Sequence, residues 1–228
     1  MSTLRVEFIG RADAAKTVTR WHYSKVMPVA PVVCFGAWED EKYVGCVVFS
    51  PGSNRNLGSP YGLSSTECVE LVRVALRPRK TPTSKVVGVC LRVLKKHSPG
   101  LRLIVSFADP VQGHVGAIYQ AMNWMYAGLT PPTFEWRHDG KRLNKRAFTG
   151  ANFGSARRQL PPGAVKVDVP GKHRYLYPMD ESMRKALAHI CSPYPKRRPV
   201  EGFGDHSRQG GADPTPTLHP AKADIEHE

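Results

Sequence analysis

The sequence lacks the cysteine pattern of a disulfide-bonded or zinc-binding protein. Five cysteines occur among 228 residues, an odd number, and no two of them form a Cys-x-x-Cys pair. Most of them lie in apolar stretches of strand or helix character. This usage is typical of buried thiols in a reducing compartment, so we expect a cytoplasmic protein.

The chain also has no long apolar run and few acidic residues. No stretch approaches the roughly 20 apolar residues of a membrane-spanning helix, and residues 1–5 do not resemble the start of a signal peptide. The formal net charge is +14, from 33 Lys and Arg against 19 Asp and Glu. Residues 193–228 hold five basic and six acidic residues, so residues 1–192 carry a net charge of +15. This excess favours a polyanion partner such as nucleic acid. We expect no membrane partner, because the sequence shows neither a spanning segment nor a signal peptide.

Apolar runs of strand length alternate with amphipathic stretches along residues 1–192. The expected strands are 4–9, 32–38, 43–49, 68–76, 101–107, 124–127 and, at a sheet edge, 172–177; the expected helices are 12–21, 84–96, 113–123 and 181–190. This order predicts an α/β protein with too few crossovers for a doubly wound nucleotide fold. We expect one domain over 1–192 with a basic insert at about 131–160, and a disordered tail over 193–228, where Pro, Gly, His and charged residues dominate.

Polar residues follow the apolar strand that ends near Phe107. Asp109 and His114 lie in the turn after this strand, and ligands of open α/β sheets bind beyond such strand ends. Ser106 lies on the strand itself. The alternative is that Asp109 only caps the next helix and that His114 is a surface residue.

Charged residues also interrupt the strand at 68–76. Glu70 and Arg73 are three residues apart, so they fall on opposite faces of a strand and are not expected to pair. This favours a site role for Arg73.

A basic turn follows that strand and leads into the helix at 84–96. The free amides at the start of a helix, together with nearby cations, form a ready phosphate site. Its candidate residues are Arg77, Arg79, Lys80, Thr83 and Ser84. The alternative is a Thr or Ser cap within an ordinary basic loop.

The insert is the most basic stretch of the chain. Residues 137–158 hold seven Lys or Arg against one acid, with aromatic residues interleaved. Cations suit phosphates and rings offer stacking faces, which favours nucleic-acid binding over a merely solvated face. The candidate contacts are Arg137, Lys141, Arg142, Lys145 and Arg146, with Arg55 from the polar loop at 51–62.

The element order resembles the acyl-CoA N-acyltransferase (GNAT) fold, a mixed central sheet flanked by helices. That resemblance implies coenzyme A pyrophosphate at the basic turn, although the usual R/Q-x-x-G-x-G/A motif is replaced by RPRKTPTS at 77–84. It also places Tyr119 where acyltransferases often hold a tyrosine acid for the leaving thiolate.

A closer resemblance is carried by five motifs in order: RWHYS at 20–24, ELVRVAL at 70–76, SFADP at 106–110, GH at 113–114 and IYQAMNW at 118–124. Together they resemble the Mom family of bacteriophage DNA-modification proteins. The resemblance implies conversion of adenine in double-stranded phage DNA to its N6-carbamoylmethyl (methylcarbamoyl) form, in the host cytoplasm, which protects the DNA from restriction. It also implies a requirement for iron and a link to acetyl-CoA.

The same resemblance assigns iron ligation to His22, Tyr23 and Asp109. Imidazole, phenolate and carboxylate are suitable iron ligands. The alternative is that His22 and Tyr23 pack at a helix end while Asp109 caps a turn. His114 would be a fourth ligand or a nearby base, and Arg73, Ser106 and Tyr119 would complete the catalytic set. The adenine amine is expected to reach this site by base flipping.

Two other functions remain open from the sequence. One is an ordinary N-acetyltransferase of a protein or small amine, which needs no metal and little DNA affinity. The other is a basic DNA-binding module without catalysis. The oligomeric state is not predicted.

Overall fold

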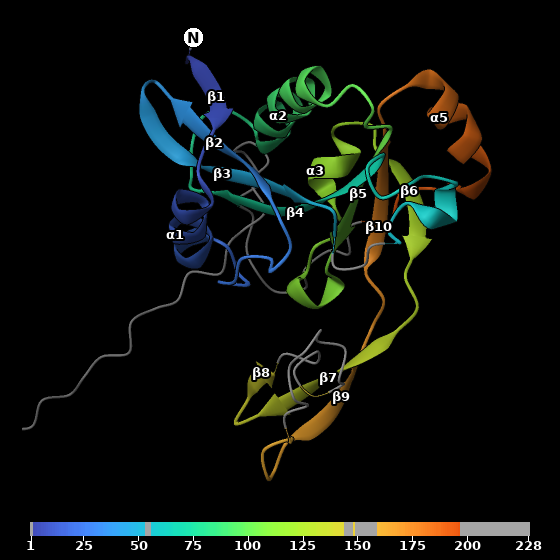
Figure 1. Ribbon diagram of the computed structural model, residues 1–228. Helices are drawn as coiled ribbons and strands as arrows, with labels where there is room; N and C mark the ends of the chain where they lie inside the picture. The colour runs from blue at the N-terminus through green and yellow to red at the C-terminus, as the bar shows by residue number, and fades with distance from the viewer. Residues whose placement is uncertain (1, 53–55, 144–147, 149–158, 197–228) are drawn as a thin grey trace, which may run out of the picture.

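The fold is a seven-stranded mixed sheet with helices on both faces, seen in a computed structural model (Figure 1). The structure describes residues 2–52, 56–143, 148 and 159–196, so Arg55, Lys145, Arg146 and the tail from residue 197 lie outside it. The strands are β1 (Leu4–Phe8), β2 (Val33–Glu39), β3 (Lys42–Ser50), β4 (Cys68–Leu76), β5 (Leu103–Ala108), β6 (Met125–Leu129) and β10 (His173–Pro178). Their order is β1-β2-β3-β4-β5-β10-β6. The predicted α/β fold class, a mixed central sheet flanked by helices, is confirmed.

Helices cover the two faces of this sheet. The helices are α1 (Arg11–Trp21), α2 (Thr83–His97), α3 (Ala117–Gln120) and α5 (Glu181–Leu187), with single 3-10 turns at Ser59–Tyr61, Pro110–Gln112 and Ala188–Ile190. Val47 packs in the same cluster as α2, whereas its neighbours Cys46 and Val48 pack with α1. Because side chains alternate along a strand, α1 and α2 lie on opposite faces. Four of the five cysteines are buried in this core, as predicted, and Cys191 is exposed.

The central feature of the sheet is the one parallel pair, β4 and β5. Their register covers only Cys68 to Glu70 against Leu103 to Val105. Beyond these residues β4 pairs with β3 alone and β5 pairs with β10 alone. The two strands therefore separate toward their carboxyl ends and leave an opening in the middle of the sheet.

Two predicted elements differ from the structure. The helix expected over 113–123 is reduced to Ala117–Gln120, because Gly113 and Gly116 adopt φ of +72° and +79°, which lie outside the helical region. The edge strand expected at 172–177 is wrong, since β10 lies between β5 and β6. Its adjacent Tyr175 and Leu176 are both fully buried, one on each face, which an edge strand would not require.

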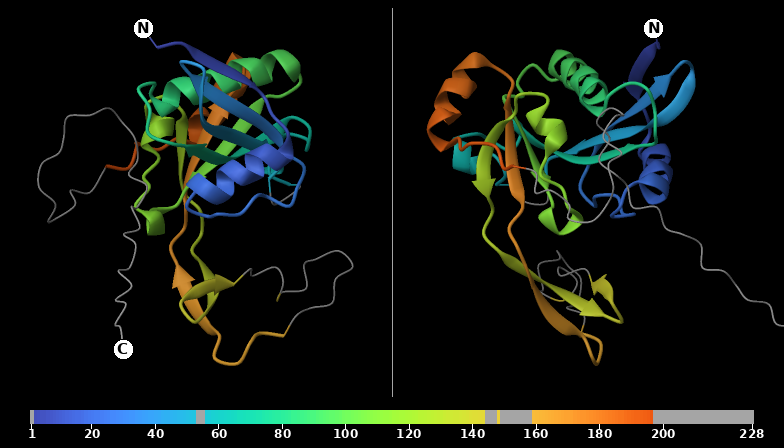
Figure 2. Two further views of the ribbon diagram at one scale, coloured as in Figure 1. Left: turned by 90° about the vertical axis from the view of Figure 1, so that its left-hand side faces the viewer. Right: turned by 180° about the vertical axis from the view of Figure 1, so that it is seen from behind.

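The insert forms a small sheet of its own, which the sequence analysis did not predict. Its strands are β7 (Thr133–His138), β8 (Lys141–Leu143) and β9 (Val165–Val169), in the order β8-β7-β9. This three-stranded lobe projects from the body on the chain segments that join β6 to β7 and β9 to β10, as Figures 1 and 2 show from different sides. Within the described part of the chain, no helix has the length and apolar character to cross a membrane.

Gly116 is a glycine whose replacement is expected to disturb the packing of this body. A Cβ there would lie 2.3 Å from the Tyr175 ring, whereas a Cβ on Gly113 would meet nothing within 4 Å. Both glycines have positive φ, so comparing the two alanine variants isolates the packing contact from the backbone strain. Urea unfolding should show that Gly113→Ala costs about 1 kcal/mol and Gly116→Ala about 1–3 kcal/mol more. Equal losses would mean that the close approach of Tyr175 is not needed.

Candidate active site

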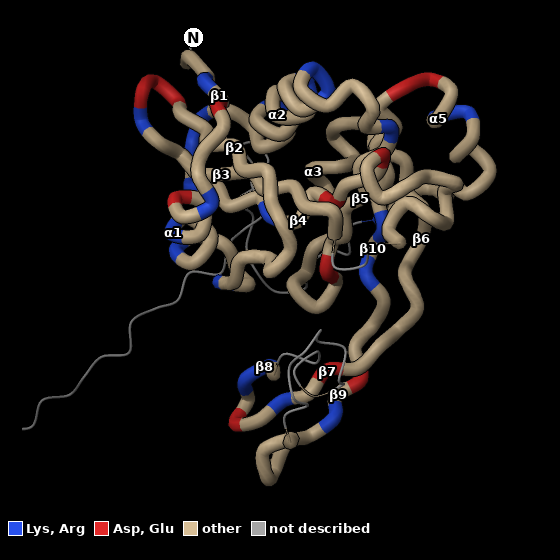
Figure 3. The backbone as a smooth tube through the Cα atoms, viewed as in Figure 1, with Lys and Arg blue, Asp and Glu red and all other residues tan. Residues whose placement is uncertain are grey.

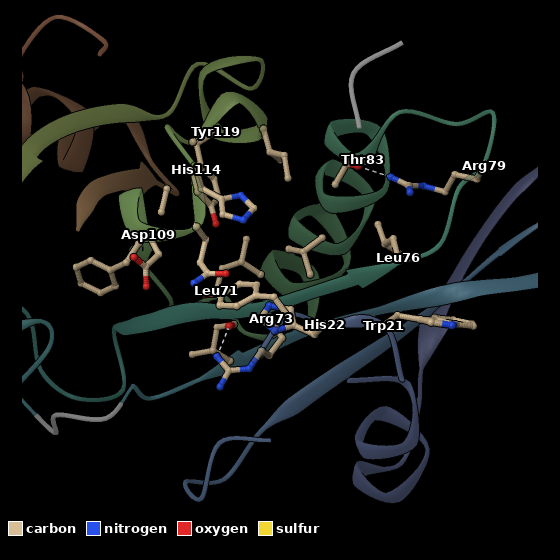
Figure 4. Close-up of a pocket in the computed structure, with 18 residues that line it drawn as sticks. Trp21, His22, Leu71, Arg73, Leu76, Arg79, Thr83, Asp109, His114 and Tyr119 are labelled. Carbon is tan, nitrogen blue, oxygen red and sulfur yellow. Dashed lines mark hydrogen bonds between the residues drawn. The ribbon is translucent and has the colours of Figure 1, made fainter. Parts of the chain in front are cut away.

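A polar cleft occupies the opening between β4 and β5. Figure 4 shows the 18 residues that line it. They come from the end of α1, from β4, from the start of α2 and from the β5–α3 segment. The cleft therefore brings together the predicted residues His22, Tyr23, Arg73, Asp109 and Tyr119, although they lie on distant parts of the chain.

Three rings lie in a row on one side of the cleft. The centroid of Tyr23 is 4.3 Å from that of His22 and 5.7 Å from that of His114, and both pairs are inclined by about 30°. Tyr23 thus connects the end of α1 with the turn after β5. The two segments that the sequence analysis proposed as partners are in contact.

His22 is buried and uncharged. Its Nδ1 accepts a hydrogen bond from the Ser24 amide at 3.1 Å and lies 2.8 Å from the Ser24 hydroxyl. Burial, with smaller contributions from Arg73, His114 and Lys25, lowers the pKa of His22 to about 3. A neutral imidazole fixed through one nitrogen suits a metal ligand or a hydrogen-bonding group and makes a weak general base near pH 7.

Arg73 lines the cleft from β4. Its Nε donates to the Val26 carbonyl at 3.0 Å and its Nη1 to the Val72 carbonyl at 2.6 Å. Burial lowers the pKa of the guanidinium, which nevertheless remains charged at neutral pH. The cleft therefore holds a fixed positive charge.

Asp109 caps the turn after β5 and also faces the cleft. Its Oδ1 accepts from the Val111 amide at 3.1 Å, and its Oδ2 pairs with Lys172 Nζ at 3.1 Å. Asp109 therefore caps a turn and also lines the cleft, so each of the two sequence-based interpretations describes part of its environment. Lys172 was missed because the insert separates it from Asp109 by more than sixty residues, and no local pattern connects the two.

Ser106 lies behind the cleft, at the point where β4 and β5 part. Its hydroxyl donates to the Leu71 carbonyl at 2.8 Å and is 2.7 Å from the Tyr119 hydroxyl. A carbonyl only accepts and a serine has one hydrogen, so while Ser106 donates to Leu71 the Tyr119 hydroxyl donates to Ser106. Ser106 thus replaces the strand hydrogen bond that Leu71 loses and fixes Tyr119.

The far end of the cleft is formed by Arg79 and Thr83, at the start of α2 (Figure 4). Arg79 donates to the Thr83 hydroxyl, and its buried Nε has no hydrogen-bond partner among the described residues. The amides of Lys80 and Thr81 are bound by the buried carboxylate of Glu39, at 2.9 and 2.6 Å. Of the five candidates for phosphate binding, Arg79 and Thr83 line the cleft, whereas Arg77, Lys80 and Ser84 do not.

Three of the predicted nucleic-acid residues, Arg137, Lys141 and Arg142, lie on the lobe, in two different environments. Arg137 and Arg142 both pair with the buried Glu135, at 2.7 and 2.9 Å, so part of their charge is compensated. Lys141 is exposed on β8, and Lys166, which was not predicted, is exposed on β9. Figure 3 shows the Lys and Arg positions of the lobe and of the segment leading into β10.

The donor set of the cleft limits what can hold a metal. No three His, Cys, Asp or Glu side chains converge as a metal-binding group anywhere in the described ranges. A three-residue metal site in the cleft would therefore need at least one donor of another kind, such as the Tyr23 phenolate.

The fold and the cleft define the class of protein: an α/β protein with a mixed central sheet, whose candidate active site opens between two parting parallel strands. Within that class, the chain belongs to the Mom protein family, which matches residues 3–196. The family resemblance noted in the sequence is thereby confirmed.

The chain is similar to one characterised relative in particular, the methylcarbamoylase Mom of Escherichia phage Mu. The two are 28% identical over 207 residues, which cover 85% of this chain and 84% of the relative.

Solved acyltransferase structures are more distant. A Bacillus subtilis acetyltransferase in complex with CoA is 14% identical, with a TM-score of 0.44 over 78% of this chain and 100% of that one. An Arabidopsis thaliana acetyltransferase, NAA60, in complex with acetyl-CoA is 9% identical, with a TM-score of 0.45 over 78% and 99%. The N-acyl amino acid synthase FeeM from uncultured soil microbes is 12% identical, with a TM-score of 0.44 over 83% and 97%.

The hydrogen bonds of Ser106 predict a coupling that can be measured. Ser106→Ala leaves the Leu71 carbonyl without its partner and should lower the free energy of unfolding by about 1–3 kcal/mol. Tyr119→Phe removes only the second bond. Because the two residues share a contact, the double variant should lose less than the sum of the single losses in urea unfolding. Additive losses would show that the Ser106–Tyr119 bond contributes nothing to stability.

Proposed function

We propose that this chain modifies adenine in DNA at N6, producing the carbamoylmethyl form, with the cleft between β4 and β5 as its active site. The observation that carries the proposal is the convergence of His22, Tyr23, Arg73, Asp109 and Tyr119 on one cleft from three separate segments. The relative in phage Mu is named a methylcarbamoylase, which supports the same chemistry here. The product would protect phage DNA from host restriction.

Charge supports DNA as the substrate. Residues 133–172, which contain the lobe, hold nine Lys or Arg against three acids. The lobe lies beside the body, so a duplex could contact both at once (Figure 1). The N6 amine of a stacked adenine cannot enter a cleft in the sheet, so the base would have to leave the duplex stack. We assign the lobe and the exposed Lys141 and Lys166 to binding the phosphate backbone.

The start of α2 suits the phosphates of an acyl-CoA-type donor. α2 is a long helix whose first amides carry partial positive charge, and Arg79 and Thr83 face the cleft there. The buried Nε of Arg79 has no partner within the part of the chain that the structure describes, so an anion bound here would satisfy it. Tyr119 lines the same cleft, where its hydroxyl can give a proton to a leaving group and Ser106 can then turn to stabilise the phenolate.

The donor atoms in the cleft fit iron by their chemistry. His22 is neutral, Tyr23 adjoins it, and Asp109 faces the same cleft, so these three would hold the ion. Asp109 would have to release Lys172 to do so. Bound iron would supply the redox chemistry that forming a bond from a methylene carbon to N6 calls for, since simple acyl transfer places a carbonyl on the nitrogen. The residues of the cleft would hold the amine and accept its hydrogen bonds.

The proposal is tested by the nucleosides of bacteria that express the chain. Under iron-replete conditions, mass spectrometry should detect an adenosine heavier by one carbamoylmethyl group. Tyr119→Phe should reduce the modified fraction by roughly a hundredfold or more, the range typical of a lost general acid. Tyr177→Phe, which removes a hydroxyl outside the cleft, is the matched control and should leave the fraction unchanged.

Two outcomes would contradict the proposal, and each would indicate a different function. Unmodified DNA from well-expressed wild-type chain, with acetyl-CoA turnover on a small amine, would indicate an ordinary N-acetyltransferase. Unmodified DNA with tight, salt-sensitive DNA binding would indicate a binding module.

The iron ligands are tested separately by metal analysis of purified chain. His22→Gln, Tyr23→Phe and Asp109→Asn should each lose most of the iron that the wild type binds, because each removes one of three donors. His138→Gln, on the lobe, is the control and should retain it. Lys172→Met should bind iron at least as well as the wild type, since Asp109 then has no competing cation. Full iron content in all three ligand variants would contradict the assignment.

A further inference from the structure

An apolar loop adjoins the cleft, because it follows two residues that line the cleft and its Val26 carbonyl accepts a hydrogen bond from a third, Arg73. Residues 24–31, SKVMPVAP, follow directly after His22 and Tyr23, and we call them the lip loop. Val26 is 62% exposed and Val29 is 92% exposed. Val111, in the turn after Asp109, is also exposed. Exposed apolar side chains therefore lie on two segments that adjoin residues of the candidate active site.

The backbone of the lip loop is held in place although its valine side chains are exposed. Arg73 donates to the Val26 carbonyl at 3.0 Å, and Arg11 donates to the Pro28 carbonyl at 2.5 Å and the Ala30 carbonyl at 3.1 Å. The two prolines of the loop restrict it further. A loop fixed in this way presents Val26 and Val29 as a stiff apolar projection, which is a different feature from a scattered surface valine.

The surroundings of the loop are basic. Arg11, Lys16 and Arg20 are exposed along α1, and Lys25 is exposed within the loop, against the single acid Asp13 on α1. The lip loop and the turn that carries Val111 both lie on the side of the body from which the lobe projects (Figures 1 and 2). An apolar projection bordered by cations suits a DNA duplex, whose phosphates meet the cations while the apolar groups meet the base stack.

We propose that Val26 and Val29 enter the DNA base stack beside the target adenine and fill the space it leaves when it turns into the cleft. This rests on the proposed function. Proteins that unstack bases commonly insert apolar side chains between base steps, and the unstacked state has to be stabilised for the base to reach an enzyme. The bond from Arg73 to Val26 connects this wedge to the cleft, so both are positioned by the same residue.

The test compares the double variant Val26→Ser/Val29→Ser with the wild type. Leu129→Ser is the matched control, because Leu129 is a 55% exposed apolar residue on β6, outside both the cleft and the loop. The first measurement is the modified fraction of cellular adenine. The second is the affinity of purified chain, by fluorescence anisotropy, for a paired duplex and for the same duplex with one unpaired adenine.

The double variant should lower the modified fraction roughly tenfold or more, since it must unstack the base without the wedge. Its affinity for the duplex with an unpaired adenine should stay within about twofold of the wild type, because that base is already free to turn. The Leu129→Ser control should match the wild type in both measurements.

Three results would overturn the wedge. The first is an unchanged modified fraction in the double variant. The second is an equal loss of affinity for both duplexes. The third is a wild type that runs as a dimer in size-exclusion chromatography while the double variant runs as a monomer. The last would identify the loop as an interface between copies of the chain.

If the wild type modifies no DNA, the proposed function fails instead. The binding measurement then decides alone, and a double variant that binds the paired duplex as well as the wild type overturns the wedge.

Discussion

The separation of β4 from β5 is the constraint on which the rest of the structure depends. The two strands are the only parallel neighbours in the seven-stranded sheet, and they stay paired over three residues each. Where they part, backbone groups lose their ladder partners, which must be replaced because unpaired buried polar groups are costly. Ser106 provides one replacement through the Leu71 carbonyl. The same opening exposes both strand ends to one cleft, so the site is a consequence of the sheet.

Much of this architecture could be read from the sequence because the signals are local. The apolar run at 68–76 coincides with β4, and the breaks after Trp21 and Phe107 place His22, Tyr23 and Asp109 at element ends. The parts that could not be predicted are non-local. The position of β10 inside the sheet depends on the chain returning from the lobe, and the pairing of Asp109 with Lys172 depends on that return.

Buried carboxylates in the cleft region and in the lobe change which predicted groups are available to a substrate. Glu39 binds the amides of Lys80 and Thr81 in the basic turn, ahead of α2, whereas Arg79 and Thr83 from the same region face the cleft. Glu135 likewise compensates Arg137 and Arg142 on the lobe. In both places a buried carboxylate fixes the geometry of its neighbours. The charge available to a substrate therefore differs from the charge counted in the sequence.

The central claim is that the modified adenine enters the cleft between β4 and β5. The most direct measurement is photo-crosslinking of the chain to duplex DNA that carries a photoreactive adenine analogue, followed by peptide mapping. The account predicts crosslinks to the peptides that line the cleft, within residues 21–23, 71–83 and 107–119. Crosslinks confined to the lobe, with none in these peptides, would contradict it.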